Sequence, residues 1–309
     1  MTKSTTRVAA DLETFTQTEI TAKDVVAKAG RKNLIINGGF DVSQRGDYTT
    51  AVTIAAAGYY IDRWKNNTFS VTGTTQHKKL QTVDGGITNT NRVEATSSAT
   101  GYLYVYQRIE YFEYLGGQTL TFSAWVKSNS SDVGLITYNG SGEGWIKRAL
   151  HSGSGGWEFL TATYVMDATL VGALNVGVST FGDGGLASAI VTGDYFEVTN
   201  VQLELGSVAT DFEHRSYGEE LALCQRYYQV LSGREQSYAG NTFHKLTPIH
   251  LRPALRASPF TSVTYTGSSN LAGLTVYSAD NQVINIKLQA TTDGMCNTGV
   301  YTLTADAEL

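Results

Sequence analysis

The fold is decided by residues 120–127, which read LTFSAWVK and in which large apolar side chains alternate with small or polar ones. Leu, Phe, Ala and Val fall on one face of this stretch, and Trp125 falls on the other face beside Ser and Lys. Successive side chains of a β-strand point to opposite sides of the sheet, so a period of two is the pattern of a strand with one buried face. We therefore predict a strand here that packs its apolar face on a second sheet.

The same alternation recurs at residues 102–109, 159–166 and 195–205. In the last of these the period slips near Thr199 and Asn200, which indicates a β-bulge that changes which face looks inward. Loops rich in glycine, serine and asparagine separate these stretches, and helix signals are almost absent. Many short strands joined by such turns predict an all-β fold, an antiparallel β-sandwich.

The chain is expected to divide into four parts. Residues 1–32 are polar, threonine-rich and too short to hold a core, so we expect an arm that docks on another molecule. Residues 33–215 are expected to form the sandwich, residues 216–232 a connecting helix, and residues 233–309 a second, smaller β domain. The strands expected in this last part lie near residues 262–266, 274–277, 283–288 and 300–303.

The predicted helix of residues 216–232 has recognisable ends. Ser216 and Glu219 have the spacing of a capping box, and Gly233 stands where a C-terminal cap would be. The apolar side chains between them recur with a period of 3.5 residues. This period suits either a helix packed on the edge of its own sandwich or a seam between identical chains. These side chains are Tyr217, Leu221, Cys224, Tyr228 and Leu231.

Composition excludes several classes of protein. The 309 residues carry a net charge of −5 and two cysteines. The chain has no apolar run long enough to span a bilayer and no basic block, so we expect no membrane insertion and no nucleic-acid partner. Two cysteines are too few for a disulfide framework, and the first residues lack the apolar core of a secretory signal. We therefore expect the chain to be made in a reducing cytoplasm.

Catalytic signatures are missing from the sequence. It contains no G-x-S-x-G elbow, no G-x-G-x-x-G, no Walker loop and no H-E-x-x-H, and its five histidines are scattered. The expectation is a protein that is not an enzyme.

Aromatic side chains are the more informative population. Rows of rings on a β face can stack against sugars, because a pyranose presents a patch of C–H bonds to the π face. The alternative is that these rings fill a second sheet or a subunit interface. The candidate glycan-binding residues are Trp125, Tyr102, Tyr104, Tyr106, Trp145 and Trp157.

Several phrases, taken in order, resemble a domain found in tailed-bacteriophage tail-fibre and virion appendage proteins. Each phrase alone is a weak signal, whereas the ordered set is specific and spans roughly residues 33–260. The phrases are NLIINGGFDVSQRG at 33–46, YIDRW at 60–64, FSAWVK at 122–127, VQLELGSVATDFEHR at 201–215, YGEELALCQRYY at 217–228 and RPALRASP at 252–259.

This resemblance implies a structural virion protein with a jelly-roll sandwich related to carbohydrate-binding modules. The function that it implies is non-enzymatic: a tail fibre or receptor-binding appendage that attaches to host-surface polysaccharide and resides in the virion. The expected partners are further copies of the chain in a homotrimer, and the tail hub or capsid through the N-terminal arm. The alternatives are a capsid-decorating head fibre or cement protein and, less favoured, a polysaccharide depolymerase.

The resemblance also assigns roles to individual residues. Phe40 and Trp64 would be core anchors, and Asp62 and Arg63 would join Arg45 in a buried ion-pair network. No cofactor is expected beyond a possible structural calcium ion, which related sugar-binding jelly rolls hold beside a similar phrase. The oxygen ligands available for it here are Asp41, Glu197 and Asn200.

Overall fold

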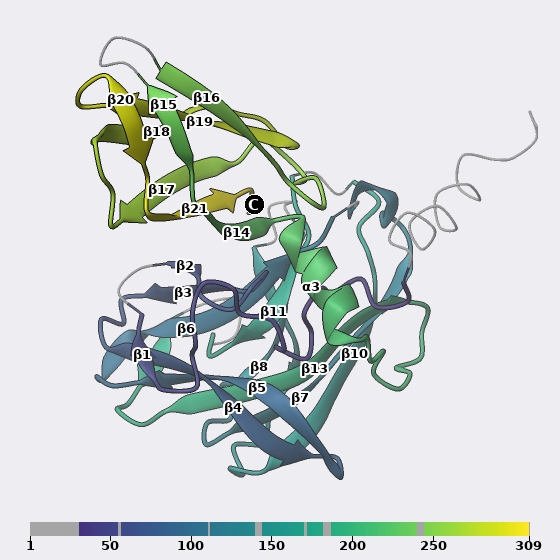
Figure 1. Cartoon of the computed structure of the whole chain (residues 1–309). Helices are drawn as coiled ribbons and strands as arrows, with labels where there is room; N and C mark the ends of the chain where they lie inside the picture. The colour runs from purple at the N-terminus through teal and green to yellow at the C-terminus, as the bar shows by residue number, and fades with distance from the viewer. Residues whose placement is uncertain are drawn as a thin grey trace, which may run out of the picture. The chain divides into compact units, whose positions relative to one another are not determined.

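The computed structural model describes residues 31–54, 57–110, 112–139, 144–169, 172–181, 187–239 and 244–308 (Figure 1). Most of the predicted N-terminal arm, residues 1–30, lies outside the described residues. The described chain is all-β, with two antiparallel sandwich sheets, one short α-helix and smaller sheets near the C-terminus, so the predicted fold class is confirmed. In this described part, no helix has the length and hydrophobicity needed to cross a membrane.

The chain forms two compact units. The first contains residues up to Phe40, Tyr48–Gly58 and Trp64–His214, and the second contains Asp41–Asp47, Tyr59–Arg63 and the chain from Arg215 onward. The second unit thus includes two short segments that the sequence placed within the expected sandwich.

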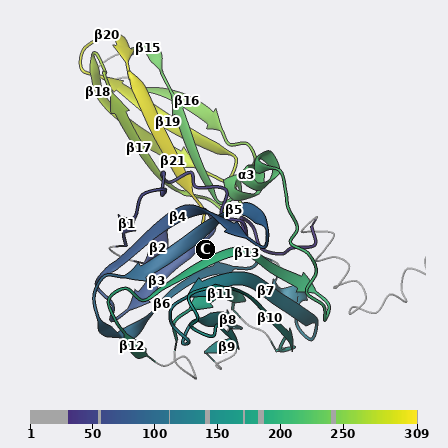
Figure 2. The same ribbon diagram turned by 90° about the horizontal axis from the view of Figure 1, so that it is seen from below.

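The first unit is a sandwich of two sheets (Figure 2). One sheet has six strands in the order β1-β4-β5-β13-β7-β10, and the other follows the order β2-β3-β6-β11-β8-β9, with β12 paired to β6. The strands of the first sheet are β1 Val52–Thr53, β4 Thr74–Val83, β5 Gly86–Ala95, β13 Tyr195–Leu205, β7 Thr119–Ser128 and β10 Trp157–Val165. Those of the second are β2 Gly58–Tyr59, β3 Lys65–Phe69, β6 Ala99–Arg108, β11 Asn175–Ser179, β8 Gly134–Tyr138, β9 Trp145–Leu150 and β12 Ser188–Ile190, and a short 3₁₀ turn, η1 Phe112–Tyr114, precedes β7.

The alternation of apolar and polar side chains along β7 explains why the two sheets pack face to face. Its apolar side chains are fully buried between the sheets, together with those of β13 and β6, whereas Trp125 points to the outer face. β13 pairs with β7 in two registers, Thr199 opposite Trp125 and then Gln202 opposite Ser123. The predicted bulge is therefore confirmed, and Asn200 within it takes a left-handed φ of 50°.

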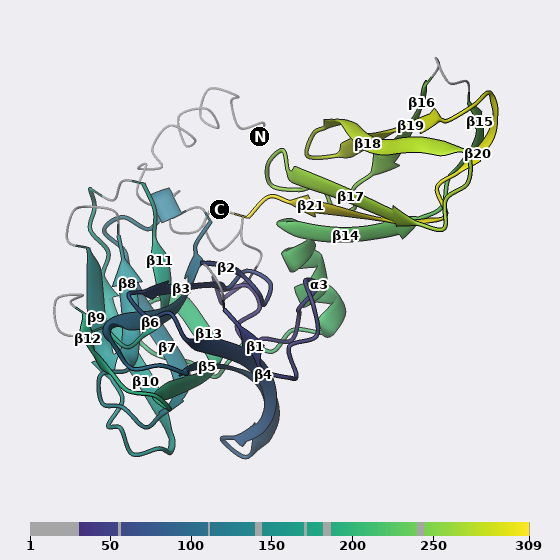
Figure 3. The ribbon, with the colours of Figure 1, turned by 90° about the vertical axis from the view of Figure 1, so that its left-hand side faces the viewer.

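The second unit contains two three-stranded sheets and a two-stranded one (Figure 3). Leu, Ile and Ala side chains from both three-stranded sheets share one core. All four strands predicted here are confirmed, and each is longer than expected. The sheets are β14 Tyr228–Gly233, β21 Val300–Asp306 and β17 Phe260–Thr266; β16 His244–His250, β19 Val283–Ala290 and β18 Leu271–Ala279; and β15 Gln236–Ala239 with β20 Gly294–Asn297.

The predicted helix is present but shorter than expected. α3 spans Tyr217–Gln225 and begins with the predicted capping box, in which Ser216 and Glu219 bond to each other's backbone. The prediction that it continues to residue 232 was wrong, because residues 228–233 form β14 and pair with β21. The aromatic and β-branched residues of this segment suit a strand, and a short run of apolar spacings does not separate the two structures. With nine residues, α3 is too short for the heptad seam that the sequence left open.

Candidate functional site

The phrase that opens at Asn33 ties the chain to β13. The Asn33 side chain is fully buried; its Oδ1 accepts hydrogen bonds from the N–H groups of Ile35 (2.9 Å) and Leu203 (3.1 Å). Its Nδ2 donates to the carbonyl of Val201 at 3.0 Å. An amide is the side chain that donates and accepts at once, which explains asparagine at this position.

The NGGF phrase that follows forms a tight turn. Asn37 and Phe40 take left-handed φ values of 58° and 56°. The Asn37 carbonyl accepts a bond from the indole N–H of Trp64 at 2.8 Å, and the Phe40 and Trp64 rings lie 4.9 Å apart and fully buried. A Cβ on Gly38 would lie 2.2 Å from the Val201 carbonyl oxygen, so only glycine fits there.

The closing phrase, residues 201–215, folds back across the outer face of the six-stranded sheet. Thr210 donates to the Glu204 carboxylate from its backbone N–H at 2.8 Å and from its hydroxyl at 2.7 Å. Gln202 donates to the Thr210 carbonyl at 3.0 Å and accepts from the Glu213 N–H at 2.9 Å. These bonds hold Phe212 and His214 over the sheet.

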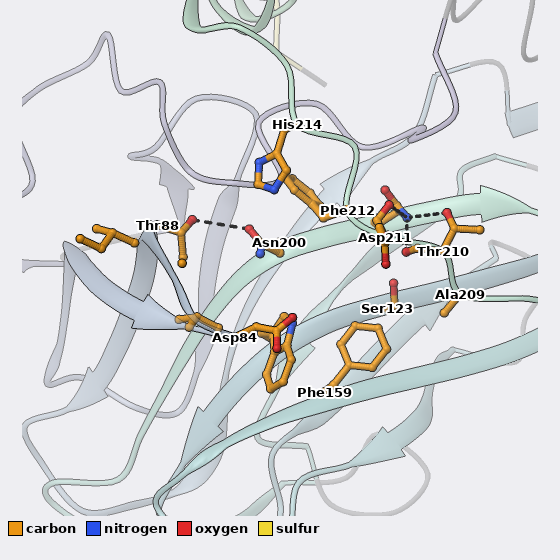
Figure 4. A pocket seen from close by; sticks show the side chains of 15 residues that line it. Asp84, Thr88, Ser123, Phe159, Asn200, Ala209, Thr210, Asp211, Phe212 and His214 are labelled. Carbon is orange, nitrogen blue, oxygen red and sulfur yellow. Dashed lines mark hydrogen bonds between the residues drawn. The ribbon is translucent and has the colours of Figure 1, made fainter.

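A groove of about 420 Å³ lies between this segment, the β4–β5 hairpin and the outer face of β13, β7 and β10 (Figure 4). The bulge in β13 contributes Asn200 and Gln202 to it. The groove is lined by Val83, Asp84, Gly86, Ile87, Thr88, Ser123, Trp125, Phe159, Asn200, Gln202, Ala209, Thr210, Asp211, Phe212 and His214.

Two pairs of aromatic rings stand in the groove. Trp125 and Phe159 are direct cross-strand partners on β7 and β10, with ring centroids 5.5 Å apart, and Phe159 is 45% exposed. Phe212 and His214 meet edge to face at 4.9 Å. A partly exposed Trp–Phe pair on a rigid sheet, with its rings tilted by 50°, offers an apolar platform to a ligand.

Polar groups border the platform. The Asn200 amide oxygen accepts two long bonds, from the Thr88 hydroxyl at 3.5 Å and the Thr199 hydroxyl at 3.4 Å, so both contacts are weak. Asp84 and Asp211 supply carboxylates, and the described lining contains no lysine or arginine. The arrangement can therefore stack one face of an uncharged ring and accept hydrogen bonds from its hydroxyl groups.

The other predicted glycan-binding residues lie in two places. Trp157 shares the outer face of β10 with Phe159, opposite Lys127, but does not line the groove. Tyr102, Tyr104, Tyr106 and Trp145 lie together on the other sheet and pack with Ile136 and Phe181. Tyr104 is only 9% exposed and its hydroxyl accepts a bond from Asn67 at 2.6 Å, so its ring is enclosed by its neighbours.

The two predicted anchors of the ion-pair network lie in the second unit. Arg45 pairs with Asp62 at 3.3 Å, and Arg63 pairs with Glu308. Burial raises the pKa of Asp62, although Gln44 and Arg45 act in the opposite direction. Neither Glu308 nor Asp306, which bonds Arg45 at 3.1 Å, could be predicted, because 245 residues separate Arg63 from Glu308 and 261 separate Arg45 from Asp306.

The three proposed calcium ligands have other surroundings. Glu197 is buried on β13 and pairs with Arg92 at 2.7 Å, while Asn200 faces the groove. Asp41 belongs to the second unit. Among the described residues, no three His, Cys, Asp or Glu side chains are grouped so as to hold a metal ion.

His77, on the same outer face as Arg92, makes the first unit sensitive to acid. It is buried, neither ring nitrogen bonds to any of the residues that the structure describes, and its pKa is lowered by burial and by Lys79 and Arg92. The free energy of unfolding should therefore fall as the pH drops below the usual value of 6.5, because the unfolded chain then binds a proton that folded His77 excludes. Urea unfolding at pH values above and below 6.5 measures this change. His77→Gln should make the free energy of unfolding less dependent on pH, and His250→Gln, the control at an exposed histidine, should leave the pH dependence as it is in the parent chain. Parallel curves for His77→Gln and the parent chain would contradict it.

Comparisons with known proteins add likenesses of fold. No protein-family model and no curated protein sequence matches this chain. Similar solved structures include the enzymatically active domain of bacteriophage CBA120 tailspike protein 4 (11% identity, TM-score 0.37), of which the match covers 21%, against 56% of this chain. TmCBM61 in complex with β-1,4-galactotriose matches with 12% identity and TM-score 0.34 over 57% of this chain and 100% of its own. The C-terminal family 22 carbohydrate-binding module of Clostridium thermocellum Xyn10B matches with 13% identity and TM-score 0.35, over 51% of this chain and 99% of the module. At these values the likenesses identify no ligand or activity for this chain.

Proposed function

We propose that this chain is a non-enzymatic attachment protein of a tailed-phage virion and that it binds host-surface glycan in the groove on the six-stranded sheet. The observation that carries the glycan part is the partly exposed Trp125–Phe159 pair, held on two adjacent strands and bordered by amide, hydroxyl and carboxylate groups. The virion part rests on the ordered phrases between residues 33 and 260, which resemble fibre proteins.

The groove suits neutral rather than acidic sugars. Its described ionisable side chains are Asp84, Asp211 and His214, so a uronate or sialate would meet like charge without a cation to pair with. A neutral pyranose can lay its C–H face on Trp125 and donate hydroxyl groups to Asn200 and the carboxylates. One such site binds weakly, and several copies on one particle raise the avidity.

Trp125→Ala is expected to weaken binding to a neutral polysaccharide about tenfold or more, because it removes the larger ring of the platform. Affinity electrophoresis in gels that contain neutral polysaccharides, chosen from a glycan array, measures this. Trp157→Ala is the matched control, since Trp157 shares the outer face but not the groove, and it should bind like the parent chain. Equal retention of the two variants, or no retention of the parent chain by any neutral glycan, would remove the groove from the proposal.

The remaining parts of the proposal have separate tests. Antibody labelling of phage particles in electron micrographs distinguishes a tail appendage from a head decoration, and an unlabelled particle would refute both. Static light scattering tests the homotrimer.

Release of reducing ends from a bound polysaccharide, abolished by Asp84→Asn or Asp211→Asn, would make the groove a catalytic site and overturn the non-enzymatic assignment.

A further inference from the structure

A second cavity, of about 550 Å³, opens at one side of the sandwich between β9 and β10. Each of these strands ends the order of its sheet, so the cavity lies between the two sheets at their edge, apart from the groove on the outer face. Its lining mixes apolar and polar groups: Asn139, Ile146, Arg148, Tyr164, Val165, Met166 and Asp167.

Arg148 brings a positive charge to this cavity in a fixed orientation. Its Nε donates to the Thr137 hydroxyl at 2.8 Å, and the guanidinium lies over the Tyr164 ring, 4.3 Å from its centroid. These two contacts hold the guanidinium against the Tyr164 ring. Within the described residues, neither terminal nitrogen of Arg148 bonds to a protein group, so both remain able to donate to a ligand.

Tyr164 supplies an unsatisfied hydroxyl in the same place. The residue is 9% exposed, and its buried Oη has no hydrogen-bond partner in the described structure. A buried hydroxyl without a partner is unfavourable, so such a group normally meets a ligand or an ordered water. Burial raises the pKa of Tyr164, which keeps the phenol protonated and a donor.

The geometry points to a second binding site in this cavity, one that takes the carboxylate of an acidic sugar. A guanidinium with two available nitrogens matches the two oxygens of a carboxylate, and the Tyr164 hydroxyl adds a third donor. Asp167 limits the ligand further. Its Oδ1 accepts bonds from the Thr169 N–H (2.8 Å) and hydroxyl (2.7 Å). The negative charge of Asp167 disfavours a ligand with two negative charges, and its carboxylate can accept a hydrogen bond from a sugar hydroxyl beside the bound carboxylate. The chain would then hold neutral and acidic sugars at different places.

The test is a saturation-transfer NMR titration of the full chain with sodium glucuronate, and with glucose as the uncharged match. We expect glucuronate to bind at about millimolar affinity and glucose not to compete. Arg148→Gln should weaken glucuronate binding about tenfold, the loss of one bidentate charge-assisted contact. Arg148→Lys should recover only part of it, because an ammonium lacks the planar fork.

Tyr164→Phe separates ligand binding from folding. It should weaken glucuronate binding several-fold, while the melting temperature without sugar stays the same or rises, because the variant removes an unsatisfied buried hydroxyl. Trp125→Ala should leave glucuronate binding unchanged, so failure of the groove and failure of this cavity remain distinguishable. Glucuronate binding that survives Arg148→Gln in a folded variant, or glucose that binds as well as glucuronate, would overturn the inference, as would a parent chain that binds neither.

Discussion

Replacing Glu308 by alanine is expected to lower the free energy of unfolding of the second unit by about 3–5 kcal/mol, the range for breaking one side of a buried ion pair. Arg63 is fully buried and Glu308 is 3% exposed, and the two side chains bond directly. Burial by itself would lower the pKa of Arg63, but the Glu308 charge and hydrogen bond, together with Tyr227 and Tyr59, outweigh it and raise the pKa, so Arg63 stays charged. Without Glu308 this buried charge loses its ion-pair partner, while its contact with the Tyr227 ring, 3.5 Å from the guanidinium carbon to the ring centroid, remains.

Asp306→Ala is the matched control for this change. Asp306 also bonds an arginine of the network, Arg45 at 3.1 Å, but its side chain is 39% exposed, so water can replace it. We expect a loss below about 1 kcal/mol for the control, as for other exposed ion pairs. Urea unfolding of both variants, followed by circular dichroism, measures the difference. Similar midpoints for Glu308→Ala and Asp306→Ala would show that the Arg63 pair does not stabilise the unit.

Gly38→Ala is expected to be as severe, with a loss of about 3 kcal/mol or more from overpacking against backbone. The added Cβ would meet the Val201 carbonyl oxygen at 2.2 Å. That carbonyl cannot move freely, since it accepts from Asn33, and the Val201 N–H donates back to the Gly38 carbonyl at 3.0 Å.

Gly86→Ala makes the same chemical change without the clash. The nearest atom to a Cβ on Gly86 is the Val83 carbonyl oxygen at 3.8 Å, an ordinary contact. Thermal unfolding should therefore separate the two alanine variants by many degrees, with Gly86→Ala close to the parent chain. If both melted together, the opening phrase would not be packed against β13 as described.

The fold could be predicted because burial of one sheet face leaves a period of two in the sequence. β7 and β13 show this, including the slip at Thr199 and Asn200 that became the bulge. The long hairpin of β4 and β5 escaped prediction, because its strands carry polar side chains on both faces. The error at Tyr228 had a different cause. A few spacings of three and four residues do not identify a helix, and the strand partner of Tyr228, Asp306 on β21, is 78 residues away in sequence.

The groove was predicted only in part. Trp125 was identified from its place on the polar side of its strand, but Phe159 was not, since its role depends on being opposite Trp125 in the register of β10. Phe212 and His214 reach the groove through side-chain bonds of Gln202 and Glu204, which periodicity does not encode. Tyr104 shows the converse: an alternating tyrosine suggested exposure, yet rings from other strands enclose it.

The long separation between Arg63 and Glu308, 245 positions, sets an order of events during synthesis. At about 5–20 residues per second, the ribosome makes Glu308 roughly 10–50 s after Arg63. Trp64–His214, the rest of the first unit, is translated within that interval, whereas Asp41–Asp47 and Tyr59–Arg63 are made before the main part of the second unit. The nascent chain therefore completes the second unit last, after every residue of the first unit has been translated.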